Sequence, residues 1–246
     1  MNLKMEMNSI LILIGISCMG SFIQRVSGFG FGIFVMTILP HLLPSYGEAT
    51  ALSGMLAGSM SIVVAIRMRK FIVWREVLPI LTIFGVVSFF AVSAVANFDD
   101  KFLKHILGAI LIVISIYFFF ISEKIKLKPT LFVQTILGII SGIMGGLFAM
   151  QGPPSVLYFL ASCSSKEKYI AHSQTYFALG NLMMTFFRAG NGFVTPAVGM
   201  AYGCGIIGVI IGLFIGGKVF KKIPHKVLKK IVYAYMAVSG VVALCA

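Results

Sequence analysis

Acidic residues are scarce in this chain. Only 7 of its 246 residues are Asp or Glu, and charged residues of either sign make up 11%. A soluble domain carries about 25% charged residues. Hydrophobic residues make up 59% of the chain and the mean hydropathy is +1.02, so there is too little polar surface for folding in water. The composition therefore predicts an integral membrane protein.

The shortage of reactive side chains also argues against a membrane-embedded enzyme. The chain has no carboxylate cluster and no H-E-x-x-H motif, which would activate water or bind a catalytic metal. Its four cysteines, at 18, 163, 204 and 245, form no C-x-x-C pair, and no histidine lies at metal-ligand spacing. A nucleotide-binding loop is also missing. We therefore expect no catalytic residues, no metal and no cofactor.

The apolar runs indicate helices. They reach about 20 residues, which is the length of a helix that spans a bilayer. A membrane β-barrel would instead alternate apolar and polar residues over about 10 residues. The chain has a net charge of +13, and the basic residues that produce it lie between the apolar runs. This placement favours basic loops beside anionic lipids over binding of nucleic acid. We expect an all-α fold with about 8 transmembrane segments.

These segments can be placed by their apolar windows. The windows cover residues 9–24 and 29–44, 49–66, 77–96, 102–122, 130–141 and 155–163, 169–188, 197–217 and 227–245. The first two windows together run about 35 residues, or about 52 Å as a helix, which is too long for one straight span. Whether they form a re-entrant hairpin or one kinked span stays open at this stage.

Two glycine-rich signatures lie about half a chain apart. The first runs from Gly20 to Gly32 and leads to Pro40, and the second runs from Gly138 to Gly146 and leads to Pro154; a shift of 114 positions superimposes them. Broken helices at matching places in two halves are typical of a transporter's binding site. We predict a single membrane domain, 1–246, made of two repeats at about 9–122 and 130–246 joined by a basic linker at 123–129.

Counting basic residues predicts the orientation. Arg25, which lies within a broken segment, is left out of the count. If each broken segment crossed the membrane once, 9 basic residues would lie inside and 10 outside; if each returned to its own side, the numbers would be 15 and 4. The positive-inside rule favours the second arrangement. It places the loops at 67–75, 124–128, 166–168 and 218–230 in the cytoplasm of a multi-pass cell (plasma or inner) membrane protein. The two repeats are then inverted copies.

The candidate substrate-binding residues share small or polar side chains at the two signatures. Glycine lets the backbone expose N–H groups, and the N-termini of half-helices favour binding of an anion. A cation within the membrane adds positive charge that attracts an anion. The candidates are Gln24, Arg25, Ser27, Gly28, Gly30, Gly32, Ser141, Gly142, Gly145, Gly146, Gln151, Gly152, Pro153, Pro154 and Asn181. The alternatives are close helix packing for the glycines, a simple kink at the prolines, snorkelling for Arg25 and interhelical hydrogen bonding for Asn181.

Three further residues are candidates for a proton relay, namely His41, Glu48 and His172. Each has an ordinary alternative, which is hydrogen bonding at the membrane interface. Arg188 lies at the end of its predicted helix, and we expect it to snorkel toward the interface.

The signatures resemble those of the sulfite exporter TauE/SafE family of membrane permeases. The resemblance rests on Ser27–Gly32 leading to Leu39-Pro40, and on Ser141–Gly146 leading to Gly152-Pro153-Pro154. It implies transport of small sulfur-containing anions such as sulfite or organosulfonates, often by export. Many relatives carry a denser glycine run in the second half, where this chain has Gly145-Gly146-Leu147.

Together these observations favour a secondary transporter that carries a small anion by alternating access between two repeats. Its partners would be the anionic substrate and membrane lipids, not nucleic acid, and a homo-oligomer is left open. An anion channel and a non-transporting membrane assembly subunit are the alternative hypotheses.

Overall fold

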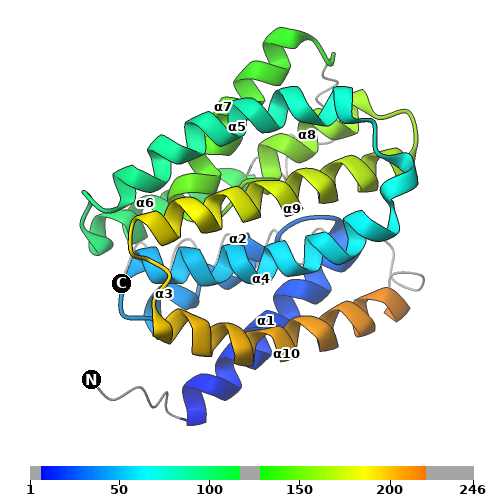
Figure 1. The fold of residues 1–246 in the computed structure, drawn as a ribbon. Coiled ribbons are helices and arrows are strands. Elements are labelled where there is room, and N and C mark those ends of the chain that lie inside the picture. The colour runs from blue at the N-terminus through cyan, green and yellow to red at the C-terminus, as the bar shows by residue number, and fades with distance from the viewer. Residues whose placement is uncertain (1–6, 117–127, 220–246) are drawn as a thin grey trace.

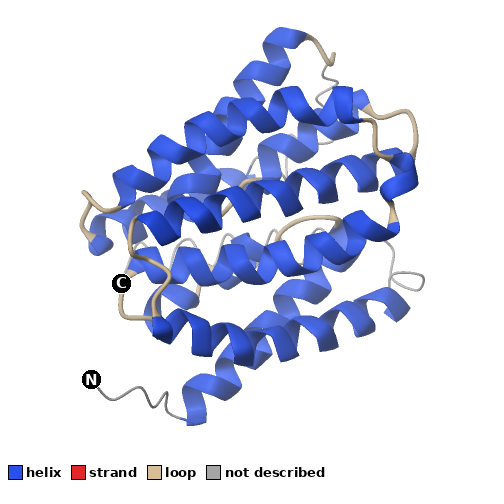
Figure 2. Cartoon of the chain, viewed as in Figure 1, coloured by secondary structure: helices blue, strands red, loops and turns tan. Residues whose placement is uncertain are grey.

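The computed structural model describes residues 7–116 and 128–219, and every regular element within them is a helix (Figures 1 and 2). The all-α fold is therefore confirmed. The helices are α1 (Met7–Ser27), α2 (Phe31–Val35), α3 (Leu39–Leu42), α4 (Tyr46–Arg67), α5 (Trp74–Val95), α6 (Asp100–Ile116), α7 (Leu131–Phe148), α8 (Gly152–Ser162), α9 (Lys166–Gly190) and α10 (Pro196–Val219), with a short 3-10 helix at Arg69–Phe71. The predicted helix at 227–245 and most of the linker at 123–129 lie outside the described residues.

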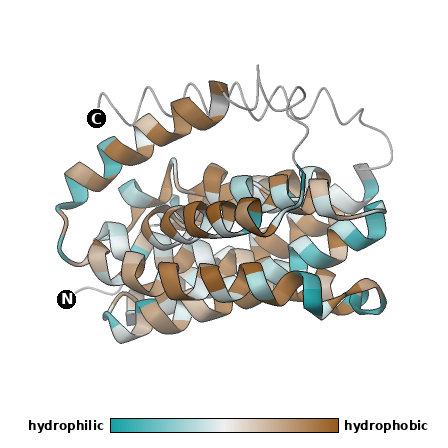
Figure 3. Cartoon of the chain, turned by 90° about the horizontal axis from the view of Figure 1, so that it is seen from above, coloured by the Kyte–Doolittle hydropathy of each residue, from teal (hydrophilic) through white to brown (hydrophobic). Residues whose placement is uncertain are grey.

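Five of the described helices are long and apolar enough to cross a membrane, namely α1, α4, α5, α7 and α10. Large apolar side chains such as Phe90 and Phe186 point outward, and hydrophobic residues dominate the helices in Figure 3. A membrane supplies the apolar surroundings that such a surface needs. These features are those of a multi-pass membrane protein.

Helices α4 and α9 form an antiparallel pair at the centre of the bundle. Small residues on α4 allow the close approach: Gly47 faces Phe193, Gly54 faces Arg188 and Gly58 faces Asn181. A Cβ atom on Gly54 would lie 2.8 Å from the Arg188 guanidinium, so a larger residue there would displace that side chain. Among the described helices, α4 and α9 each contribute more buried residues than any other helix.

Helix α10 packs along α1, and the two run parallel. Three glycines spaced four residues apart on α10, at positions 208, 212 and 216, contact α1 progressively from Ile14 to Arg25. Helix α7 runs parallel to α5 in the same way, because the glycines at 138, 142 and 146 contact α5 from Ile83 to Ala91. Each outer pair thus uses a small-xxx-small pattern for close backbone contact.

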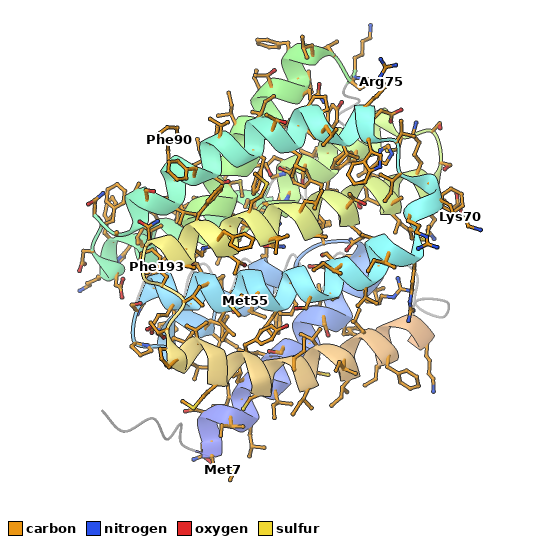
Figure 4. The ribbon with its side chains drawn as sticks, viewed as in Figure 1. Met7, Met55, Lys70, Arg75, Phe90 and Phe193 are labelled. Atoms are coloured by element: carbon orange, nitrogen blue, oxygen red, sulfur yellow. The ribbon has the colours of Figure 1, made fainter. Side chains whose placement is uncertain are left out.

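The bundle has two ends. We call the end that holds residues 67–75 and 163–168 the basic end, and the end that holds residues 43–45, 96–99 and 191–195 the opposite end. An ion pair of 2.7 Å between Lys168 and Glu76 joins the first turns of α9 and α5 at the basic end. At the opposite end the Tyr46 amide donates to Asp100 over 2.9 Å. Figure 4 shows Lys70 and Phe193 at these two ends.

Helices α1 and α7 enter the bundle from different ends. Helix α10 runs from the opposite end to the basic end and α1 is parallel to it, whereas α5 runs the other way and α7 is parallel to that. After each of these helices the chain breaks and turns back, through α2 and α3 in the first half and through α8 in the second. The first half is therefore a re-entrant hairpin, although its returning arm is two short helices and not the predicted single helix at 29–44.

The second break lies later than the sequence signature predicted. Gly28 and Gly30 leave helical geometry with φ of 89° and 108°, but α7 continues through Ser141–Gly146 and ends at Ala149, which has φ of 56°. Gly142, Gly145 and Gly146 thus serve packing, and the prediction that they break the helix is wrong. Helix α7 ends at Phe148, 121 residues after the end of α1 at Ser27. The duplication stays a prediction, with a structural register near 121 in place of 114.

Candidate functional site

The two breaks touch each other in the middle of the bundle. A Cβ atom on Gly32 would overlap the carbonyl oxygen of Ala149, and one on Gly152 would lie 3.3 Å from Phe29. Backbone from one hairpin thus rests directly on backbone from the other. Only glycine at position 32 allows this contact.

A small polar cavity of about 30 Å³ lies at this contact. Residues from both hairpins and from α9 line it, including Gln24, Gly30, Gln151 and Asn181. Gln24 is buried, donates to Ser61 over 3.2 Å and accepts from the Phe31 amide over 3.2 Å, which satisfies a first-turn N–H of α2. Such a volume holds one or two water molecules, so the hairpins are closed upon each other here.

Hydrogen bonds hold the second break against α9. Ser141 donates to the Gln151 carbonyl over 2.6 Å and lies 2.8 Å from the Tyr176 hydroxyl. Pro153 and Pro154 lie buried in the first turn of α8, where proline's missing N–H is not needed for the helix. The Oε1 atom of Gln151 is buried and has no hydrogen-bond partner among the described residues. This atom lies against α9, 2.5 Å from the position that a Cβ atom on Gly180 would take.

A larger cavity of about 700 Å³ lies toward the basic end, and we call it the vestibule. Three cationic residues line it, namely Arg25, Arg67 and Lys166, against largely apolar walls. Gln24 lines both the vestibule and the small cavity, so it separates the two. Cations with low-dielectric walls concentrate anions. Arg25 therefore lies in the vestibule, away from the point where the breaks meet, and its part in substrate binding stays a prediction.

Ser27 and Gly28 also line the vestibule. Ser27 donates to the Ile23 carbonyl over 2.7 Å, which caps the end of α1. The Gly28 carbonyl accepts a hydrogen bond of 2.9 Å from Gln174 on α9. The first break is thus tied to α9 on its vestibule side.

Arg188 is completely buried, and the prediction that it snorkels is wrong. Its Nη2 donates to the carbonyl oxygens of Gly145 and Gly146 over 2.9 and 3.3 Å, at the end of α7. Its Nε and Nη1 find no hydrogen-bond partner among the described residues. A buried guanidinium with unsatisfied donors is costly unless a ligand completes it.

The surroundings of Arg188 connect it to the small cavity. A Cβ atom on Gly54 would lie 2.8 Å from Arg188 Nη1 and 3.5 Å from Asn181 Oδ1, so both side chains border the same position. Ser53 Oγ is buried without a partner among the described residues and lies 3.6 Å from the Cβ position of Gly32. Gln24, Asn181 and Arg188 therefore mark a polar path from the vestibule, past the breaks, to the opposite half of the bundle.

A pattern in the sequence marks this path. Gln174, Asn181 and Arg188 are seven residues apart, which places them on one face of α9. Gly47, Gly54 and Ser61 on α4 have the same spacing, so that a small face on α4 can lie against a polar face on α9. The polar face of α9 and the small face of α4, taken together, would have indicated that Arg188 is buried.

The structure does not bring the three relay candidates together. His41 is exposed at the opposite end, and Glu48 is buried in the first turn of α4 with its Oε2 unpaired among the described residues. His172 lies at the basic end and contacts Cys163 over 3.4 Å, with Glu76 at 3.6 Å. No relay connects these groups within the part of the chain that the structure describes.

The group around His172 contains three metal-ligand types. Donor atoms of Glu76, Cys163 and His172 lie within 4.8 Å of one another. The Nε2 of His172, however, accepts a hydrogen bond of 3.0 Å from the Val73 amide, so a neutral imidazole presents Nδ1–H, not a lone pair, to the other two. Burial raises the pKa of the Cys163 thiol, which keeps it protonated. The arrangement therefore suits a proton better than a metal ion.

Comparison with known proteins identifies one family. The family model described as sulfite exporter TauE/SafE matches residues 12–243, which is nearly the whole chain. No curated protein and no solved structure gives a match.

Proposed function

The chain belongs to the sulfite exporter TauE/SafE family, a family of transporters and not of enzymes, and we propose that it carries a small oxyanion such as sulfite or an organosulfonate by alternating access. The observation that carries this proposal is the polar path. Two hairpins that enter from different ends meet at a cavity which one glutamine separates from a cationic vestibule.

The chemistry along the path suits an anion. Arg25, Arg67 and Lys166 attract negative charge into the vestibule. Beyond Gln24, the Asn181 amide is a hydrogen-bond donor, and so are the Nε–H and Nη1–H of Arg188, which have no partner among the described residues. Guanidinium groups bind oxyanions through several N–H groups at once, and such charge-assisted bonds are about twice as strong as neutral ones. We assign Gln24, Asn181 and Arg188 to substrate binding.

The polar path is open toward one end of the bundle and closed toward the other, which supports alternating access. The vestibule is open toward the basic end, which the positive-inside rule assigns to the cytoplasm. In the opposite half, Arg188 is bonded to the end of α7, and Gly47 is packed against Phe193. This conformation is therefore inward-facing, and outward opening requires the end of α7 to separate from α9. A channel is less consistent with it, because the cavity of about 30 Å³ and Arg188 interrupt the path.

The proposal can be tested with purified protein in liposomes. We expect saturable flux of sulfite or of a sulfonate in a panel of small anions. Gly32→Ala should abolish it, because the added Cβ would overlap the Ala149 carbonyl oxygen and force the hairpins apart. Gly199→Ala is the matched control, since nothing lies within 4 Å of a Cβ there. Normal flux in Gly32→Ala, or no flux of any anion in the wild type, would contradict the proposal.

A further inference from the structure

A second group of polar residues lies at the basic end, away from the polar path. The side chain of His172 is completely buried there between α5, the end of α8 and its own helix α9. Its Nε2 accepts from the Val73 amide over 3.0 Å, and its Nδ1 lies 3.4 Å from Cys163 Sγ and 3.6 Å from Glu76 Oε2. One imidazole thus joins three elements.

These contacts determine where the imidazole holds its proton. The Val73 amide can only donate, so Nε2 must supply a lone pair, and the single proton of the neutral ring is on Nδ1. A second proton can be added only at Nε2. The ring would then present N–H to N–H at Val73, and that hydrogen bond would be lost.

The charged groups around His172 allow the ring to accept this proton. The Oε2 atom of Glu76 on α5 is buried and has no hydrogen-bond partner among the described residues, while the side chain as a whole is 35% exposed at the basic end. Lys168 on α9 pairs with the other oxygen of Glu76 over 2.7 Å. Cys163 and Tyr158 at the α8 side are neutral hydrogen-bonding groups, and Arg69 and Lys70 on the 3-10 helix are exposed. The Glu76 carboxylate is thus the one anion that faces the ring from these elements.

Helix α9 connects His172 to both breaks. Two residues after His172, Gln174 donates to the Gly28 carbonyl over 2.9 Å, and two residues later Tyr176 lies 2.8 Å from Ser141 Oγ. A shift at the start of α9 would therefore move the groups that α9 contacts at the first break and in the second hairpin. Loss of the hydrogen bond between the Val73 amide and His172 would produce such a shift, because this bond joins the start of α9 to the residue that directly precedes α5.

We propose that His172 is the proton-binding site of a proton-coupled transporter. A proton from the basic end binds to Nε2 of His172, on the side of the ring that faces Val73. The hydrogen bond to Val73 breaks, and an imidazolium–carboxylate pair with Glu76 forms. The contact of α9 thereby moves from the residue before α5 to the first turn of α5. The coupling to transport rests on the proposed anion carrier, but the proton site itself does not.

The only tryptophan in the chain, Trp74, reports on the site because it follows Val73 directly. We expect its fluorescence in the purified wild type, without substrate, to titrate as a single step with a midpoint below the ordinary histidine pKa of 6.5, because burial lowers the pKa of His172. His172→Gln should remove the step, because the glutamine oxygen can accept from Val73 but cannot take a proton. His105→Gln, at a half-buried histidine on α6 far from Val73 in the sequence, should leave it unchanged. Glu76→Gln should move its midpoint about one unit lower, because the imidazolium loses its counter-charge.

Transport measurements form the second arm. We expect the wild-type flux to change about tenfold when the pH on the side of the basic end is varied across the step, and the His172→Gln flux to be independent of that pH. If no anion is carried at all, the anion-carrier proposal fails, while the Trp74 titration still decides the proton site. A flat wild-type titration, or an unchanged step in both His172→Gln and Glu76→Gln, would overturn the proton site.

Discussion

Replacing Arg188 by glutamine tests the assignment of the polar path most sharply. Glutamine can still donate to one carbonyl at the end of α7, but it removes the charge and the free Nε–H and Nη1–H groups. A hydrogen bond that involves a charged group contributes about 1.5–3 kcal/mol. Loss of two such bonds to a bound anion amounts to about 3–6 kcal/mol, which weakens its binding by roughly 10²- to 10⁴-fold.

The assay is the concentration dependence of anion flux in liposomes, together with thermal unfolding of each variant. Unfolding is needed because the carbonyls of Gly145 and Gly146 share the Nη2 donor, and loss of partners for buried groups destabilises by about 1–3 kcal/mol. Arg188→Lys keeps the charge with fewer donors and should be intermediate. Arg69→Gln, at an exposed cation outside the vestibule, is the control. An unchanged half-saturation concentration in a folded Arg188→Gln protein would refute the reasoning.

Two further predictions concern the vestibule and the orientation. Neutralising Arg25 and Arg67 together should lower the rate of anion uptake from the basic end several-fold and make that rate less dependent on salt, because long-range attraction by these cations is lost. An unchanged salt dependence of the rate would exclude electrostatic guidance. In a chain whose native cysteines are replaced by serine, Lys70→Cys and Glu167→Cys should be labelled from the same side of the membrane, and Ala189→Cys from the other; labelling of the first two from different sides would rule out the re-entrant second hairpin.

The helices were largely predictable because apolar length and local capping determine them. The window at 77–96, for example, corresponds to α5 at 74–95. The side chains of Ser45, Thr130 and Ser165 accept backbone N–H groups at the starts of α4, α7 and α9, as N-cap residues do. The returning arm at 29–44 was harder to predict. Its apolar pattern indicates one helix, whereas contact with the second hairpin favours two short ones.

The breaks were predictable only in the first half. Gly28 and Gly30 adopt positive φ, which glycine accepts without strain, so there the signature and the break coincide. In the second half the glycines at 142, 145 and 146 are needed for packing, and the chain turns at Ala149, a residue type that does not indicate a left-handed conformation. Small residues in an apolar helix serve both purposes, and the sequence alone does not separate them.

The binding residues depended on tertiary contacts. Arg188 lies near the end of α9 and looks like an interfacial cation, yet the end of α7 covers it and supplies its acceptors. Arg25 lies beside the first signature, yet α1 turns it into the vestibule. His172 acquires its role from Val73 and Glu76, which lie far from it in the sequence. Contacts of this kind arise between elements and leave only the weak seven-residue stripe on α9 as a signal.

The measurement that tests the central claim most directly is exchange of labelled sulfite, or of the sulfonate that is carried, across liposomes with unlabelled anion inside. An alternating-access carrier predicts saturable accumulation of label driven by the unlabelled anion, lost in Gly32→Ala and retained in Gly199→Ala. Label uptake that rises linearly with concentration and ignores the anion inside would contradict the account.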